Sequence, residues 1–178
     1  MQDILLVIDM QNDFIDSSLG TKEAVDIVAN VEKKIKTFQG LVLFTRDTHF
    51  DNYLDTQEGK KLPVKHCIKD TYGWQIRKEL DILRTTEPID KVTFGSIDLG
   101  NILLKMHKEN NISSITLIGL CTDICVISNA MIVKAFLPEV NIIVDASCCA
   151  GVHVSSHENA LNAMELCQIK VINRELIL

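Results

Sequence analysis

The chain has 178 residues, which suits one domain with a sizeable core, and we expect a single domain over residues 1–178. Apolar residues make up 47% and charged residues 24%, as in ordinary globular proteins. The net charge of −6, with no basic block, argues against a nucleic-acid or anionic-membrane partner. The first apolar run is too short for a signal peptide or a membrane span, so we expect a cytoplasmic protein with free thiols.

Strand-like and helix-like segments alternate along the whole chain. Apolar runs predict six strands, at residues 4–8, 41–45, 89–93, 115–118, 141–144 and 170–172. Apolar residues at helical spacing predict the helices between them, at residues 22–38, 75–83, 99–109, 124–136 and 156–166. The expected fold class is α/β, a doubly wound, mostly parallel six-stranded sheet. Because the strands are continuously apolar, helices should cover both faces of this sheet.

Three chemically useful side chains lie where predicted strands end. Asp9 follows the first strand, Lys91 lies near the end of the third, and Cys125 follows the fourth. Ligand sites of open parallel sheets lie beyond the carboxyl ends of the strands, so these side chains are candidates for one site. The turn at residues 9–14 contains no glycine, so the dinucleotide-binding fingerprint is absent.

Cys125 lies at the start of a predicted helix, for which Thr122 or Asp123 is the expected N-cap. Free backbone N–H groups and the positive end of the helix dipole favour a thiolate there. Asp9 is a candidate to accept the thiol proton, while the Lys91 ammonium stabilises the thiolate. Each residue also has a structural alternative, because an aspartate can cap a turn, a lysine can end a strand, and a cysteine can pack in the core.

The long irregular segment at residues 46–73 carries two histidines and several carboxylates. Asp47 and His49 are two residues apart, so in an extended segment both side chains project to the same side. Mixed nitrogen and oxygen ligands suit a divalent metal. The alternative is a solvated polar loop that binds no metal.

Residues 7–14 (VIDMQNDF) and 119–126 (GLCTDICV), with Lys91 between them, resemble the isochorismatase-like cysteine hydrolases. The resemblance covers nearly the whole chain and implies that family's fold. It also implies a triad of Asp9 as base, Lys91 as support and Cys125 as nucleophile. The cysteine favours amide hydrolysis over vinyl-ether cleavage.

The same resemblance implies a cis peptide bond between Leu120 and Cys121, a bond that does not precede proline. It implies further that the N–H groups of Cys121 and Cys125 form the oxyanion hole. Family members usually form homodimers or homotetramers, so a homo-oligomer is expected.

Nicotinamidases of this family carry a metal set that this chain matches. The resemblance implies four metal ligands, which are Asp47, His49, Glu58 and His66. Asp55 is an alternative to Glu58, and we rank it lower. The metal is expected to be zinc, with iron or manganese as alternatives. In nicotinamidases it binds the ring nitrogen of the substrate.

Phe14 and Phe94 match the aromatic positions that sandwich the pyridine ring in these enzymes. Leu62 occupies a position that is often aromatic, and whether Trp74 replaces that aromatic residue is open. The predicted function is a nicotinamidase, which converts nicotinamide and water to nicotinate and ammonia through a thioester. The alternatives are a cysteine amidase for another small amide, or a redox-sensing thiol protein that uses Cys125 and Cys121.

The remaining candidates are predicted to be structural. Asp123 and Asp145 are expected in turns or caps, with a site role for Asp145 left open. His153 and His157 are expected at the surface or an interface. The cysteine spacing fits no zinc or iron–sulfur pattern.

Overall fold

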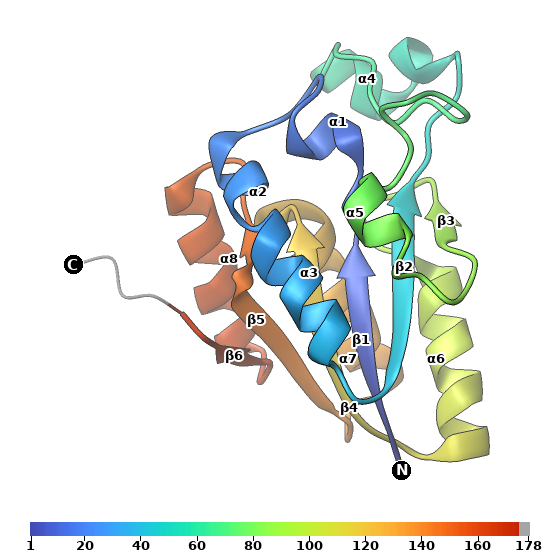
Figure 1. The fold of residues 1–178 in the computed structure, drawn as a ribbon, viewed down its shortest axis with the longest axis vertical. Helices are drawn as coiled ribbons and strands as arrows, with labels where there is room; N and C mark the ends of the chain where they lie inside the picture. Colours follow the sequence, from blue (N-terminus) through green and yellow to red (C-terminus); the bar gives the residue numbers. More distant parts are fainter. Residues whose placement is uncertain (175–178) are drawn as a thin grey trace.

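The structure is a computed structural model that describes residues 1–174. Its centre is one sheet of six parallel strands in the order β3-β2-β1-β4-β5-β6 (Figure 1). The strands are β1 (Gln2–Ile8), β2 (Leu41–Asp47), β3 (Ile89–Lys91), β4 (Ile112–Leu120), β5 (Asn141–Ala150) and β6 (Lys170–Ile172). The predicted fold class is confirmed.

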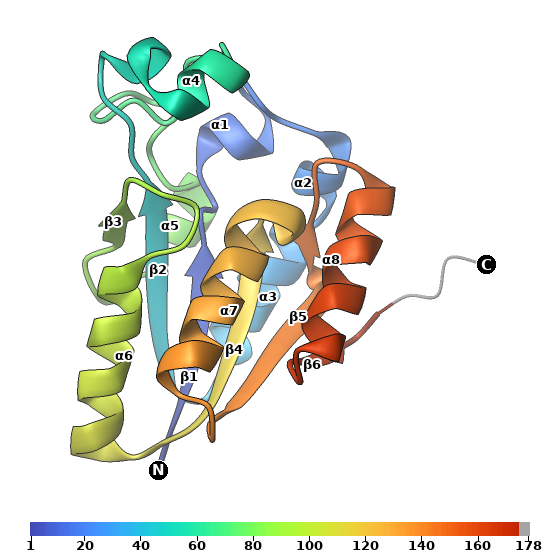
Figure 2. The same ribbon diagram turned by 180° about the vertical axis from the view of Figure 1, so that it is seen from behind.

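Helices cover both faces of the sheet. One face carries α2 (Lys22–Asp26), α3 (Val28–Thr37) and α5 (Lys78–Asp81), and the other carries α6 (Ile97–Asn110), α7 (Ile127–Phe136) and α8 (Val154–Leu166) (Figures 1 and 2). Along β1, Ile4, Leu6 and Ile8 belong to one core cluster and Leu5 and Val7 to the other. Alternate residues of a strand face opposite sides, so a continuously apolar strand supplies both cores.

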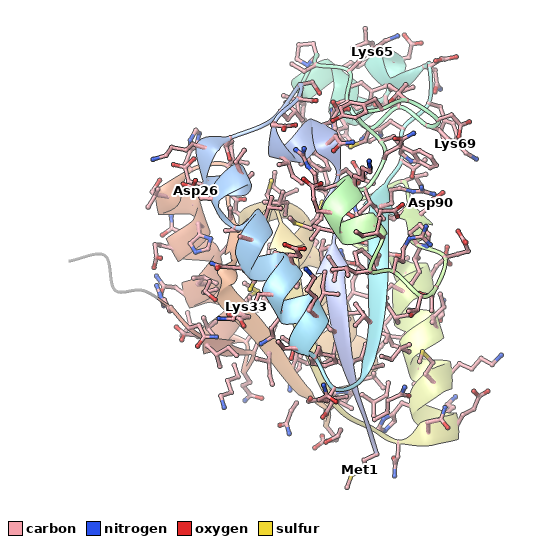
Figure 3. All side chains as sticks on the ribbon, in the orientation of Figure 1. Met1, Asp26, Lys33, Lys65, Lys69 and Asp90 are labelled. Carbon is pink, nitrogen blue, oxygen red and sulfur yellow. The ribbon has the colours of Figure 1, made fainter. Side chains whose placement is uncertain are left out.

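In the view of Figure 1, the carboxyl ends of β1 and β2 lie beneath three short helices, α1 (Asn12–Ile15), η1 (Tyr53–Asp55) and α4 (Gln57–Lys61). The last two belong to the segment at residues 46–73, in which Lys65 and Lys69 are labelled in Figure 3. This segment therefore lies over the strand ends where the candidate site residues were expected. None of the helices in residues 1–174 has the length and apolar character that crossing a membrane requires.

Two predicted elements are shorter in the structure. β3 ends at Lys91 rather than at residue 93, because Thr93 Oγ1 donates a hydrogen bond to Gly95 O (2.7 Å) and the chain turns there. The helix expected at residues 75–83 forms only over Lys78–Asp81. Ile76 instead pairs with Gln11 in an antiparallel bridge, which keeps the preceding residues extended.

Asp145 of β5 joins the sheet to two other parts of the chain. Its Oδ2 lies 2.8 Å from Lys34 Nζ of α3, and its Oδ1 accepts hydrogen bonds from Ser147 Oγ (2.8 Å) and Asn173 Nδ2 (3.0 Å). Burial alone would raise the pKa of Asp145, but the bonds from Lys34, Asn173 and Ser147 lower it below its ordinary value. Asp145 does not line the cavity described below, so its role is structural.

Replacing Asp145 with asparagine is expected to lower the free energy of unfolding by about 2–4 kcal/mol at pH 7, because Lys34 loses its charged partner. A carboxylate with a lowered pKa stabilises the fold above its unfolded pKa of about 3.9, and this contribution is lost as the pH falls through the folded pKa. Urea unfolding at pH 7, 4 and 3 should therefore show a difference from wild type that shrinks below about pH 4. Glu32→Gln, which removes an exposed pair with Lys36 on the same helix, should change stability by less than about 0.5 kcal/mol.

Candidate active site

The three residues expected at strand ends meet in one buried cluster. Lys91 Nζ lies 2.7 Å from Asp9 Oδ2 and donates a hydrogen bond to Cys125 Sγ at 3.4 Å. All three residues are at most 4% exposed. The other oxygen of Asp9 accepts a hydrogen bond from Thr45 Oγ1 (2.7 Å). A carboxylate, an ammonium and a thiol are thus held together away from bulk solvent.

Backbone geometry brings the Cys125 segment against Asp9. Gly119 of β4 pairs with Ile8 of β1 and has a φ of +117°, a conformation that favours glycine. A Cβ at this position would lie 2.1 Å from Ile8 O, so no other residue fits without moving β1. The peptide bond between Leu120 and Cys121, one residue further along, is cis, as the resemblance implied.

The thiol of Cys125 differs from the sequence-based expectation of a stabilised thiolate. Burial, together with the charge of Asp9, raises the pKa of Cys125 well above its ordinary value, and this outweighs the opposing effect of Lys91. Burial also raises the pKa of Asp9. For Lys91, burial disfavours the ammonium, but Asp9, Cys125 and Asp47 raise its pKa well above normal. Near neutral pH these shifts favour an uncharged Cys125 thiol beside a charged Lys91 ammonium.

The turn that carries Cys125 also differs from a capped helix start. Residues Thr122–Val126 form one π-helical turn before α7, and such turns are frequent at functional sites. Cys121 is its N-cap, so the expectation of Thr122 or Asp123 in that position is wrong. Their side chains instead bind residues in and just before the first turn of α8.

The second cluster lies beside the first. Ligand atoms of Asp47, His49 and His66 lie within 4.8 Å of one another, and all three residues are buried. Glu58 Oε1, from α4, lies 3.5 Å from His49 Nε2 and 3.7 Å from His66 Nε2. The four residues of the predicted metal set are therefore brought together. Asp55 is exposed and does not belong to the compact group.

The chemistry of this cluster fits a divalent metal. His49 Nε2 is buried and has no hydrogen-bond partner within residues 1–174, although it points at Asp47 Oδ2 from 3.0 Å. His66 Nδ1 donates to Val64 O (2.8 Å), which leaves the lone pair of its Nε2 facing the cluster. Burial opposes the charged form of His49, but Asp47 and Glu58 raise its pKa to about 9. The negative potential that holds a proton so tightly also attracts a metal cation.

Asp47 belongs to both clusters. Its Oδ1 lies 3.1 Å from Lys91 Nζ, while its Oδ2 faces the two histidines. Burial raises the pKa of Asp47, but the close contact with His49 and the charge of Lys91 lower it overall. The candidate metal ligands and the Lys91 ammonium are thus in electrostatic contact through one carboxylate.

A cavity of about 510 Å³ opens on both clusters. Asp47, Glu58 and His66 line it on one side and Cys121 and Cys125 on another, and Phe14, Leu62 and Phe94 also line it. Phe14 is buried, and its ring centroid lies 5.6 Å from that of His66. Phe94 is 44% exposed. Trp74 is not part of the lining, because its ring stacks on Arg46 and its Nε1 donates to Thr48 Oγ1.

Comparison with known proteins shows that residues 3–175 match the isochorismatase domain family. The chain therefore belongs to the isochorismatase family. Over 175 residues it is 28% identical to an uncharacterised isochorismatase family protein, PncA, from Bacillus subtilis (strain 168). The aligned region covers 91% of this chain and 93% of that protein.

Solved structures of the family superpose over nearly the whole chain. The pyrazinamidase/nicotinamidase of Streptococcus mutans UA159 matches with a TM-score of 0.77 and 25% identity, covering 96% of this chain and 99% of that one. The pyrazinamidase of Pyrococcus horikoshii, in complex with zinc, matches with a TM-score of 0.78 and 23% identity, covering 98% and 100%. The chain therefore has the amidohydrolase fold of the isochorismatase family.

Three buried polar residues that hold the site were not predicted from the sequence. Gln11 donates from Nε2 to Asp47 O (2.8 Å) and accepts from Asp47 N (2.7 Å). Asn129 donates to Cys125 O (2.8 Å) and to Phe94 O (3.0 Å). Thr45 binds Asp9, as described above. The position of Gln11 directly after a strand was visible in the sequence, but its partners lie far away along the chain.

Two histidines and the remaining cysteines complete the comparison with the sequence-based expectations. His157 is half-buried rather than at the surface, because its Nδ1 shares a hydrogen bond with Thr122 Oγ1 (2.8 Å). His153 is the exposed N-cap of α8. Cys67 is fully buried and follows the candidate ligand His66. The compact ligand group found within residues 1–174 contains no cysteine.

Proposed function

We propose that the protein is a metal-dependent cysteine amidohydrolase that acts on nicotinamide and releases nicotinate and ammonia. The observation that carries the proposal is the juxtaposition of two buried clusters, which share Asp47 and open on one cavity. One cluster supplies a nucleophile with its base, and the other supplies ligands for a metal. The 25% identity to a pyrazinamidase/nicotinamidase over nearly the whole chain supports the same substrate class.

The proposed reaction begins with attack of Cys125 Sγ on the carboxamide carbon. Asp9, whose pKa is raised by burial, takes the thiol proton as the C–S bond forms. The carbonyl oxygen becomes an oxyanion, which the N–H groups of Cys121 and Cys125 stabilise. Lys91 stays charged beside the sulfur and offsets the negative charge that develops in the cluster.

Collapse of the tetrahedral intermediate breaks the C–N bond. The proton on Asp9 passes to the leaving nitrogen, and ammonia departs to leave a thioester on Cys125. Water then attacks the thioester and gives a proton to Asp9, and the C–S bond breaks. The carboxylic acid product loses its own proton to water and leaves as nicotinate, and the proton on Asp9 returns to the thiolate of Cys125.

The metal set is proposed to orient the substrate. Asp47, His49, Glu58 and His66 would hold a divalent ion, most suitably zinc for two imidazoles and two carboxylates, with iron or manganese also compatible. When bound, the ion supplies a Lewis acid for a ring nitrogen. Phe14 and Phe94, which both line the cavity, would flank the aromatic ring of the substrate.

A substrate series tests this proposal. Metal-replete protein is expected to hydrolyse nicotinamide, with ammonia and nicotinate formed in equal amounts. Benzamide has the same shape but no ring nitrogen, so its kcat/KM should be lower by about 100-fold or more. Ammonia release is followed by a coupled assay, and the acid by chromatography. Absence of nicotinamide turnover would reject the substrate, and equal rates for both amides would reject the role of the metal set.

A second candidate function is hydrolysis of a larger amide. A cavity of about 510 Å³ lies in the range of about 300–1,000 Å³ that accommodates drug-sized ligands, which is more than a single-ring amide fills. Leu62 lines the cavity at a position where the resemblance led us to expect an aromatic side chain. A redox-sensing function is disfavoured, because sensor thiols are exposed and have a low pKa whereas Cys125 is buried and has a raised one.

A further inference from the structure

The turn that carries Cys125 is bound from outside the cavity by the start of α8. Figure 2 shows the N-terminal end of α8 beside the turn that precedes α7. Thr122, which is fully buried, shares a hydrogen bond of 2.8 Å between its Oγ1 and His157 Nδ1. Thr122 lies between Cys121 and Cys125, whose N–H groups are the proposed oxyanion donors. The contact therefore acts on the backbone between these two donors.

A second contact holds the same turn. The Asp123 carboxylate accepts hydrogen bonds from Val152 N (3.1 Å) and from Ser156 Oγ. Val152 also lines the cavity, so this hydrogen bond joins the turn to another residue of the cavity lining. Within the turn, the N–H groups of Ile124 (3.1 Å) and Val126 (3.0 Å) donate to Cys121 O. The turn is thus bound internally and to α8 at two consecutive side chains.

These contacts are not needed to cap α8. The N-cap His153 and Ser156 already form a capping box, in which the N–H group of His153 donates to Ser156 Oγ (3.2 Å). His157 follows this box, and its Nδ1 is directed at Thr122 rather than at its own helix. Helix formation alone therefore does not account for the orientation of the His157 ring.

We infer that His157 is a positioning residue for the oxyanion hole, acting through Thr122. It is not part of the described lining of the active-site cavity, but borders a separate cavity of about 310 Å³ on the far side of Gly151. Its hydrogen bond keeps Thr122 in place, which keeps the N–H groups of Cys121 and Cys125 aimed at one point. The inference rests on the proposed function in that it assigns the oxyanion to this turn.

Paired substitutions separate the hydrogen bond of His157 from the volume of its ring. His157→Phe keeps a ring but removes Nδ1, whereas His157→Asn keeps a polar atom near the Nδ1 position. We expect His157→Phe to lower kcat for nicotinamide by about 10–100-fold with KM changed less than about threefold, because donor alignment matters most in the transition state. His157→Asn should recover most of the lost kcat. Thr122→Val, which removes the hydroxyl from the other partner, should match His157→Phe, and the double variant should be no worse than either.

Hydrogen exchange of the peptide at residues 120–126 supplies a readout that needs no substrate. His157→Phe and Thr122→Val should speed exchange in this peptide by about tenfold or more, while peptides of the central strands stay protected. The matched control is Asn173→Ala, which removes a hydrogen bond to Asp145; within residues 1–174 Asn173 forms no side-chain hydrogen bond with the turn. It should leave both the exchange of residues 120–126 and kcat unchanged.

Each outcome bears on the inference. The inference would be overturned if residues 120–126 exchanged hydrogen at the wild-type rate in both His157→Phe and Thr122→Val. Faster exchange with an unchanged kcat would also overturn it. If the wild-type protein does not hydrolyse nicotinamide, faster exchange in the variants still supports the positioning of the turn, and only the substrate assignment fails. If His157→Phe does not fold, Thr122→Val carries the same test, because valine has the shape of threonine.

Discussion

Replacing Cys125 with alanine is expected to abolish amide hydrolysis, lowering kcat by about 10⁴-fold or more. The thiol is the only protein group in the proposed mechanism that bonds to the substrate carbon, so neither Asp9 nor Lys91 can substitute for it. The fold should persist, since the change removes one buried sulfur atom and costs about 1–2 kcal/mol. Steady-state ammonia release measures the loss, and intact-mass analysis of quenched wild-type reactions should show a nicotinoyl adduct that is absent from the variant.

Cys148→Ala is the matched control for this experiment. Cys148 is 3% exposed, close to the 4% of Cys125, but it lies on β5 outside the lining of the active-site cavity. Its replacement should therefore cost comparable stability and leave kcat within about twofold. Retention of more than about 1% of wild-type activity in Cys125→Ala would contradict the assignment of the nucleophile.

Replacing Asp47 with asparagine is expected to have the second largest effect, because this carboxylate serves both clusters. Metal content should fall from about one equivalent to less than about 0.1, and kcat/KM for nicotinamide should fall by about 10³-fold or more. Lys91 also loses one of its two carboxylate partners. Elemental analysis of the purified protein and steady-state kinetics after metal addition measure the two losses.

His49→Ala separates these two roles of Asp47. It should also lose the metal, but it leaves the contacts of Lys91 with Asp9 and Asp47 in place. The charge of Asp47 raises the pKa of Cys125, so its removal should lower that pKa and increase the thiolate fraction at pH 7.5. In metal-free protein, iodoacetamide should therefore alkylate Cys125 several times faster in Asp47→Asn than in His49→Ala or wild type. Equal alkylation rates in all three proteins would show that Asp47 acts on the metal alone.

Patterns that are local in the sequence determined much of this protein. Continuous apolar runs between amphipathic segments predicted the parallel sheet, because strands covered on both faces have no polar side. The ends of those strands located Asp9, Lys91 and Cys125, and the two-residue spacing of Asp47 and His49 indicated a shared direction. The residue types suggested roles for these three residues, the resemblance to a family implied the same roles, and the roles stay predictions.

Only the tertiary structure decided how these groups interact. Lys91 reaches from β3 to residues beyond β1 and β4, which places one ammonium against Asp9, Asp47 and Cys125. The pKa of a thiol depends on its burial and on charges from distant segments, so Cys125 has a raised pKa although its position at a helix start predicted the opposite. Asn129, which binds the backbone of Cys125 and Phe94, makes this link only because α7 packs beside the β3–α6 connection.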